Sequence, residues 1–365
     1  MKKKSARLAA MAVLIVAASS CKPQTSIVTF TKIKDIPINE AQNTIVKPHV
    51  PSALNIINDS TAIMQNGDFE LVKLNTKKGN TQTFSLSDSV VQAIRVKYGV
   101  GDTMYDVDTS FPKYVIYSLG YAHDKVYAQC GISYLRERYM NNMRVNANSH
   151  VSVCLVLDND FNLVETILFP QEESDRFGMA IHTQSFPFAV KNDTLLLSNS
   201  STSKDSMRHL IRKYVVQDGK YHFAGYGQDA DNPEYKDVRG VCFTEPCFSS
   251  SGNQLYYIDR SSIYELQTGR KEKLITEPNH LLLSAWPYDP EHFLFLTFYK
   301  GEKVNPDTTI DLKCYYHGIV TPIAPVAKLK DMYVGRLVNN IYHQVVRIGD
   351  NIHYQEYKIE IHEKQ

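Results

Sequence analysis

The residues best suited to cation chemistry lie in one short stretch, GQDADNPEYKD. Asp229, Asp231 and Glu234 place carboxylate oxygens at spacings that a hard cation such as calcium could use. Calcium loops also need a turn that glycine permits, and Pro233 interrupts the run here. A calcium site and a solvated loop therefore stay open as alternatives, and no other cofactor is predicted.

The side chains that usually carry catalysis do not form a known motif. The 12 His residues include no HxH or HExxH pair, and the chain has no GxSxG elbow and no phosphate-binding glycine loop. A site gathered from several sheets around one channel would escape such a search. An enzyme, either a metal-dependent lactonase-like hydrolase or a polysaccharide-acting enzyme, is therefore the alternative hypothesis.

Residues suited to binding occur in two places. Arg136, Arg138 and Tyr139 stand together in YLRERYMNNMR, and the sole tryptophan, Trp286, lies in SAWPYDPEH. Arg, Tyr and Trp dominate binding hot spots. The competing interpretations are a charged insertion and a core tryptophan. Residues 132–144 and residues 85–99 also have helical spacing, and each could equally be a strand or a loop.

These candidate residues need strands to position them. A repeated sequence pattern predicts those strands. A strand reaches a turn built on Asp, Asn or Glu and an apolar strand leaves it, at Asp59, Asp124, Asp193, Asn253, Glu291 and Asp350. The steps between these residues are 65, 69, 60, 38 and 59. Most copies are followed by a second alternating pair, so the repeating unit is four strands.

The repeat predicts an all-β fold, a six-bladed β-propeller of four-stranded blades over residues 26–365. The 23 Tyr, 15 Phe and many β-branched residues favour strands. A ring of blades leaves only short, protected sheet edges. The last copy lacks a strand, and the apolar segment of residues 26–33 has no hairpin partner nearby. We expect that segment to close the last blade.

The start of the chain predicts export and a lipid anchor. A basic segment, MKKKSAR, precedes about eleven apolar residues, as in a secretory signal peptide. AASSC resembles the bacterial lipobox, although Ala18 stands where Leu is usual. Residues 1–20 are then removed, Cys21 is lipidated and residues 21–25 form a tether. Simple secretion with Cys21 as a free thiol is the alternative.

Part of the chain is similar to a known group, the TolB-like six-bladed propeller lipoproteins of Gram-negative bacteria, common in Bacteroidetes. EPCFSSSGNQLYYIDRSSIYEL, residues 245–266, resembles a TolB blade, and AASSC resembles the lipobox of these lipoproteins. The chain departs from TolB in lacking a second N-terminal domain. The resemblance implies the propeller fold and a place at the cell envelope, without an activity.

The composition of the chain limits the classes of partner that it could bind. Removal of residues 1–20 takes away four basic residues and no acid, which lowers the net charge from +1 to −3. Nucleic-acid binding is not supported, since it relies on concentrated Lys and Arg. No apolar run reaches the roughly 20 residues of a transmembrane helix, so no span is expected in the mature form. Cys242 and Cys247 could form a disulfide or stay reduced.

The sequence thus favours a lipid-anchored periplasmic propeller that binds or scaffolds a protein or glycan of the envelope. Lys22 follows the lipidated cysteine and no acidic cluster comes after it. By resemblance to bacterial sorting patterns, this indicates the periplasmic face of the outer membrane.

Overall fold

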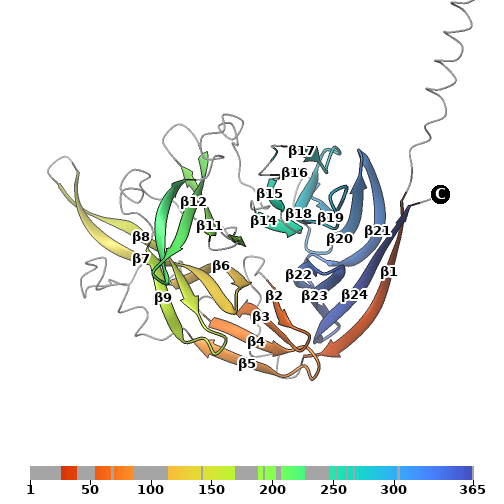
Figure 1. Cartoon of the computed structure of the whole chain (residues 1–365), viewed down its shortest axis with the longest axis horizontal. Helices are drawn as coiled ribbons and strands as arrows, with labels where there is room; N and C mark the ends of the chain where they lie inside the picture. The colour runs from red at the N-terminus through yellow and green to blue at the C-terminus, as the bar shows by residue number, and fades with distance from the viewer. Residues whose placement is uncertain are drawn as a thin grey trace, which may run out of the picture.

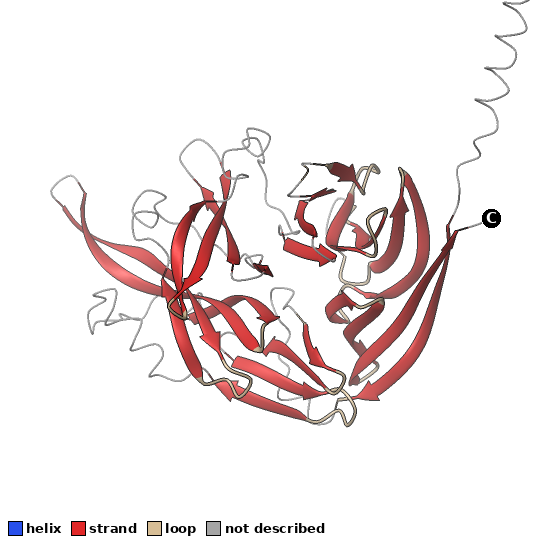
Figure 2. Ribbon diagram, in the orientation of Figure 1, coloured by secondary structure: helices blue, strands red, loops and turns tan. Residues whose placement is uncertain are grey.

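The chain is built from β-strands. A computed structural model describes residues 26–38, 54–66, 70–85, 114–140, 143–168, 188–191, 194–202, 207–226, 247–251, 254–259, 261–265, 268, 270–301 and 305–363. The described residues form strands joined by turns and irregular segments, and they include no helix (Figure 2). The prediction of an all-β chain is confirmed.

The described strands form six antiparallel four-stranded sheets. The first three consist of β2 (Asn55–Asn58), β3 (Thr61–Asn66), β4 (Glu70–Asn75) and β5 (Thr81–Ser85); β6 (Tyr114–Ala122), β7 (Lys125–Met140), β8 (Met143–Leu157) and β9 (Leu163–Leu168); and β10 (Phe188–Lys191), β11 (Thr194–Thr202), β12 (Met207–Gln217) and β13 (Lys220–Tyr226).

The other three sheets consist of β14 (Cys247–Ser251), β15 (Gln254–Asp259), β16 (Ser262–Glu265) and β17 (Lys271–Lys273); β18 (His280–Pro287), β19 (His292–Tyr299), β20 (Thr309–Tyr316) and β21 (Ile319–Lys328); and β22 (Met332–Val338), β23 (Ile341–Ile348), β24 (Asn351–Glu363) and β1 (Ser26–Pro37). We call the last of these the closing sheet, because it pairs the first described strand with the last.

Neighbouring sheets follow one another in chain order (Figure 1). The first strand of each sheet contacts the first strand of the next, from β2 through β6, β10 and β14 to β18. In the closing sheet, Arg336 of β22 donates a 2.5 Å hydrogen bond to Asn55 of β2, which returns the order to its start. Successive four-stranded sheets around an axis are the arrangement of a β-propeller.

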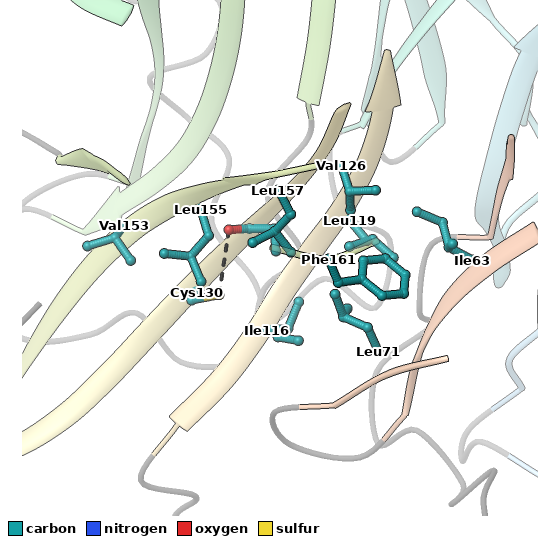
Figure 3. Close-up of a cluster of buried hydrophobic side chains, with 11 residues drawn as sticks. Ile63, Leu71, Ile116, Leu119, Val126, Cys130, Val153, Leu155, Leu157 and Phe161 are labelled. Carbon is teal, nitrogen blue, oxygen red and sulfur yellow. Dashed lines mark hydrogen bonds between the residues drawn. The ribbon is translucent and has the colours of Figure 1, made fainter. Parts of the chain in front are cut away.

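Apolar side chains fill the space between adjacent sheets. Between the sheets that contain β3 and β7, Ile63 and Leu71 pack with Val126, Leu155 and Phe161 (Figure 3). Both faces of these sheets are covered, so their strands are apolar on both sides. Burial of this surface is the main stabilising contribution, at about 25 cal/mol per Å².

The predicted repeat is correct for three copies and wrong for the last, and two copies are not tested. Asp59, Asp124 and Glu291 lie between the first and second strands of their sheets, whereas Asp193 and Asn253 fall outside the described residues. Asp350 lies between β23 and β24, one hairpin later than predicted.

In the last sheet the turn that matches the others is Asn339–Asn340, with φ of 48° and 62°. Two successive positive φ values fit a tight two-residue hairpin turn, and Asn can adopt them. The pair Gly349–Asp350, at the predicted turn, is an equally good turn sequence. Two adjacent turn signals of equal strength therefore allowed the wrong choice.

Of residues 132–144, which the spacing left open between helix and strand, residues 132–140 belong to β7 and 143–144 to β8. Their pairing continues without a register shift from Val126↔Leu157 to Met140↔Met143. Cross-strand pairing therefore outweighs the helical spacing. Of residues 85–99, Ser85 ends β5 and the others lie outside the described residues.

Candidate functional site

The β7–β8 hairpin extends beyond its own sheet. β6 pairs with β7 only as far as Ile132, and β9 pairs with β8 only from Val153 onward. Residues 133–140 and 143–150 are therefore paired only with each other among the described strands. We call these two segments the ribbon, and the sheet that carries it the ribbon sheet. The ribbon projects away from the other sheets, at the left of Figure 1.

The ribbon contains three of the predicted binding residues. Arg136 pairs with Ala147 and Arg138 with Val145, so the two arginines occupy alternate positions of β7. Tyr139 pairs with Arg144, at the next position along the strand. The sequence grouped the three residues, and the structure places all three in the ribbon.

The ribbon is more basic than the chain as a whole. It carries three arginines and one acid, Glu137, for a formal charge of +2. In contrast, the whole chain of 365 residues has a formal charge of only +1. A basic segment on a nearly neutral protein favours an acidic partner at this place.

The base of the ribbon is held rigidly on both faces. Cys130 packs in the core shared with β3 and β4, and Cys154 packs with Leu195 and Tyr214 of the next sheet. Burial raises the pKa of both thiols. They stay neutral and serve as apolar side chains rather than nucleophiles.

Trp286 is placed elsewhere. Its side chain is only 9% exposed and packs with Leu294 between β18–β21 and the closing sheet. The indole meets the ring of Tyr342 edge to face, with 6.0 Å between centroids. Trp286 therefore lies in a core and does not join the ribbon residues on a common surface.

The remaining candidates cannot be placed. Cys21, Cys242 and the predicted calcium loop with Asp229, Asp231 and Glu234 lie outside the described residues. Within the described ranges, no three His, Cys, Asp or Glu side chains gather in a way that could hold a metal ion. The described residues also include no helix long and apolar enough to cross a membrane.

A polar network that the sequence did not reveal lies in the closing sheet, on the face toward β2–β5. Tyr354 donates a 2.9 Å hydrogen bond to Glu356 Oε1, which also accepts one of 2.6 Å from Lys34 Nζ. His343 Nδ1 lies 2.7 Å from the Tyr354 hydroxyl. Because the Tyr354 proton goes to Glu356, Nδ1 of His343 is the donor to the Tyr354 oxygen. Burial lowers the pKa of His343 to about 4.

A second polar row occupies the other face of the closing sheet. Gln344 donates to Gln355 Oε1, and Gln355 donates to Asp35 Oδ2, each at 2.8 Å. Asp35 also accepts from Lys32 Nζ and lies 2.8 Å from His353 Nδ1. Burial raises the pKa of Asp35, but the hydrogen bonds from Lys32, His353 and Gln355 outweigh it, so the net pKa is lowered.

In both rows, side chains of β1 contact side chains of β24, although the two strands lie near opposite ends of the sequence. Lys34 and Glu356 are 322 positions apart in the sequence. The one sequence signal for the rows is the polar pair His343–Gln344, which lies opposite Gln355–Glu356. Adjacent polar residues on both faces of a buried strand need partners, and here they find them within the sheet.

His292 is also a buried polar residue, at a turn between β18 and β19. Its ring Nδ1 lies 2.9 Å from Asp289 Oδ2, and Asp289 Oδ1 accepts the backbone N–H of Glu291 and of His292. The ring stacks on Tyr316 at 4.4 Å. These contacts give the pair a role in holding the turn.

Comparison with known proteins gives a likeness of overall shape. No family model matches the chain, and no curated protein matches it. Among solved structures, BamB from Moraxella catarrhalis is 12% identical, with 92% of this chain and 100% of that chain covered and a TM-score of 0.36. The β-propeller domain of the Trilobed protease from Pyrococcus furiosus is 10% identical, with 86% and 97% covered and a TM-score of 0.37.

The acylaminoacyl peptidase of Pyrococcus horikoshii is 11% identical, with 82% of this chain and 44% of that chain covered and a TM-score of 0.39. Identities and scores this low say nothing of function. The class of the protein follows from its own sheets, whose order and packing are those of a β-propeller.

Proposed function

We propose that this chain is a six-bladed β-propeller lipoprotein, anchored through Cys21 at the periplasmic face of the outer membrane, that binds or scaffolds an envelope protein or glycan. The six four-stranded sheets are then its blades, and the TolB-like propeller lipoproteins are the group it resembles. The observation that carries the proposal is the ribbon. A two-stranded hairpin is at best marginally stable alone, so a basic one projecting from a packed sheet is suited to a partner.

The position of β1 supports an arrangement in which the ribbon points away from the membrane. β1 begins at Ser26, five residues after Cys21, which an extended chain spans in at most about 18 Å. A lipid on Cys21 would hold this end of the closing sheet close to the membrane. The start of β1 and the ribbon lie on opposite sides of the molecule in Figure 1. The ribbon would then point away from the anchor and toward a partner in the periplasm.

The test uses the full-length protein with a C-terminal tag in a Gram-negative host. Three forms are compared: the natural chain, Cys21→Ala, and a ribbon-shortened chain in which an Asn-Gly turn joins Ser133 directly to His150. These two residues are cross-strand partners, so the turn closes an intact ladder. Membranes are fractionated, cross-linked mildly and purified by the tag.

We expect the natural chain in the outer-membrane fraction with a reproducible cross-linked partner. Cys21→Ala moves to the soluble fraction, and the ribbon-shortened chain stays anchored but loses the partner. Membrane retention of Cys21→Ala contradicts the anchor, and a partner that survives ribbon shortening contradicts the role of the ribbon. Turnover of a substrate by the purified protein would support the alternative, a propeller enzyme.

A further inference from the structure

We propose that the strand pair formed by the start of β1 and the end of β24 lays its outer face on the surface of the lipid bilayer. This rests on the proposed function, because it requires the lipid on Cys21, and it specifies which surface of the protein meets the membrane. We call residues 26–31 and 358–363 the tip. The tip begins at the first described residue after Cys21 and lies beside the C-terminal label in Figure 1.

The inner face of the tip is fixed to the rest of the protein. β1 and β24 pair throughout the tip without a register shift. Val28 and Phe30 pack against the core that contains Trp286. The ring of Phe30 also stacks on that of Tyr357, with 4.4 Å between centroids. Because these contacts hold one face, the other face is a rigid surface rather than a frayed end.

The outer face carries the side chains that alternate with Val28 and Phe30. Ile27, Thr29 and Thr31 are exposed there, and Ile27 is 50% exposed. Ile33, at the register shift that follows the tip, is 49% exposed. Single exposed apolar residues are normal on a protein surface. These two isoleucines differ in lying on the strand that directly follows the anchor, with no acidic residue between them.

β24 completes the outer face without adding net charge. Its side chains on this face are those of Lys358, Glu360 and His362, which pair with the exposed residues of β1. Lys358 Nζ lies 2.7 Å from Glu360 Oε1, so one positive and one negative charge offset each other. A bilayer that contains anionic lipids therefore does not repel this face.

The anchor identifies the bilayer as the occupant of the outer face. The five residues from Cys21 to Ser26 span at most about 18 Å, so lipidation keeps the tip within that distance of the membrane surface. A tether this short gives a high local concentration of lipid, which allows a contact that is too weak for the unanchored protein. Exposed apolar side chains gain by entering the boundary between headgroups and acyl chains. A soluble partner gains nothing from the tether.

The opposite end of β24 supplies a matched control. Ile348 is 46% exposed and pairs with Asn351, whereas Ile27 pairs with His362. From residue 351 to residue 362 an extended strand rises by roughly 36 Å. The two isoleucines therefore have similar exposure, and only Ile27 lies next to the anchor.

The test uses the lipidated, full-length protein in vesicles of phosphatidylethanolamine and phosphatidylglycerol whose acyl chains carry a nitroxide. A fluorophore is attached to Thr31→Cys on the outer face or, as the control, to Ile348→Cys. Both proteins also carry Cys242→Ser and Cys247→Ser. Cys21 is blocked by its lipid, and the remaining cysteines are buried, namely Cys130, Cys154 and Cys314.

We expect the nitroxide to quench the probe at position 31 at least about threefold more strongly than the probe at position 348. Ile27→Thr with Ile33→Thr keeps the tether and the β-branched shape of both side chains. This double variant should lower quenching at position 31 to the level at position 348. Urea denaturation checks its fold, and Ile27→Thr alone repeats the test if the double variant unfolds. Closeness to the anchor without contact predicts quenching that the substitutions leave unchanged. That result, or equal quenching at the two positions in the unsubstituted surface, overturns the proposal.

This proposal and the proposed function fail in different ways. Membrane retention of Cys21→Ala contradicts the anchor and, with it, the bilayer contact. A protein that stays anchored but shows no excess quenching at position 31 overturns the bilayer contact alone. A probe at position 31 that is shielded from aqueous iodide in native envelopes, yet is not quenched on vesicles, assigns the outer face to another protein and also overturns the proposal.

Discussion

The closing sheet joins the two ends of the chain, whereas the ribbon joins two strands that follow each other directly. β1 pairs with β24 over eleven residue pairs and is linked to it by Lys34–Glu356 and by Asp35–Gln355. The ribbon is paired only through its own ladder among the described strands. The first region is specified by contacts between the two ends of the chain, and the second by pairing between neighbours in the sequence.

The difference follows from the cost of chain closure. Ordering two ends separated by hundreds of residues costs more conformational entropy than closing a short hairpin, although the cost grows slowly with length. The strands of the closing sheet must also take one register, because a slip of one residue moves every side chain to the other face. The two polar rows fix that register. Four predictions test this comparison.

The largest effect is expected from removing β1. Deletion of residues 22–37 takes Val28 and Phe30 from the core shared with β18–β21 and leaves β24 paired on one side only, with β23. We expect the free energy of unfolding to fall by more than about 4 kcal/mol, measured by urea denaturation of the unlipidated protein. The ribbon-shortened chain is the control and should change by less than about 1 kcal/mol. Equal losses in the two variants would remove the distinction between the regions.

Glu356→Gln tests the polar row on its own. The Glu356 side chain is 11% exposed, and its loss leaves Lys34 and Tyr354 without their carboxylate. Breaking a largely buried ion pair by removing one partner costs about 3 kcal/mol. The matched control is Glu360→Gln, four residues further along the same strand, whose pair with Lys358 is exposed and should change stability little. A loss no larger than that of the control would show that the row does not hold the sheet.

Acid should weaken the closing sheet before it affects the ribbon. Burial lowers the pKa of His343 to about 4, whereas the unfolded chain has a value near 6.5. The unfolded state therefore takes up a proton first, and stability falls as pH drops from about 6.5 to about 4. Between about pH 7.5 and about pH 5 this contributes a loss of about 2 kcal/mol.

Asp35 adds to the acid sensitivity in a lower window. Its folded pKa is lowered, so its contribution is present above the unfolded value of 3.8 and is lost only as pH falls further. Urea denaturation at about pH 5 therefore isolates His343. His343→Gln should flatten the profile between the two pH values. An unchanged profile in that variant would assign the acid loss to other groups.

The smallest effect concerns one glycine in the closing sheet. A Cβ at Gly335 would meet the hydroxyl of Tyr342, whose side chain is fully buried. Gly335→Ala should cost about 1–2 kcal/mol through overpacking. The Tyr342 hydroxyl finds no hydrogen-bond partner among the described residues. Tyr342→Phe should therefore be tolerated. It should recover only part of the stability lost in Gly335→Ala, because Met332 and the ring of Tyr342 also crowd this position. No recovery at all in urea denaturation contradicts this packing.

Much of the fold could be predicted from the sequence because its signals are local. Alternating apolar residues and turns at Asp59, Asp124 and Glu291 identified four-stranded units, since strand period and turn chemistry act over a few residues. The same local reading misplaced the last copy at Asp350, because the neighbouring Asn339–Asn340 turn satisfies the same pattern. The burial of Trp286 could not be settled from its sequence neighbours either, because it depends on Tyr342 from another sheet.

What the sequence determined by itself is the class of chain: all-β, with four-stranded repeats and a basic, aromatic segment at Arg136–Tyr139. Tertiary structure alone decided two things. It placed Lys34 and Asp35 against Glu356 and Gln355, and it carried the arginines of β7 beyond the ends of β6 and β9. The first depends on the register between β1 and β24, which local propensity does not specify, because the contacts that set it join residues from distant parts of the chain. The second depends on where β6 and β9 stop pairing with the longer hairpin.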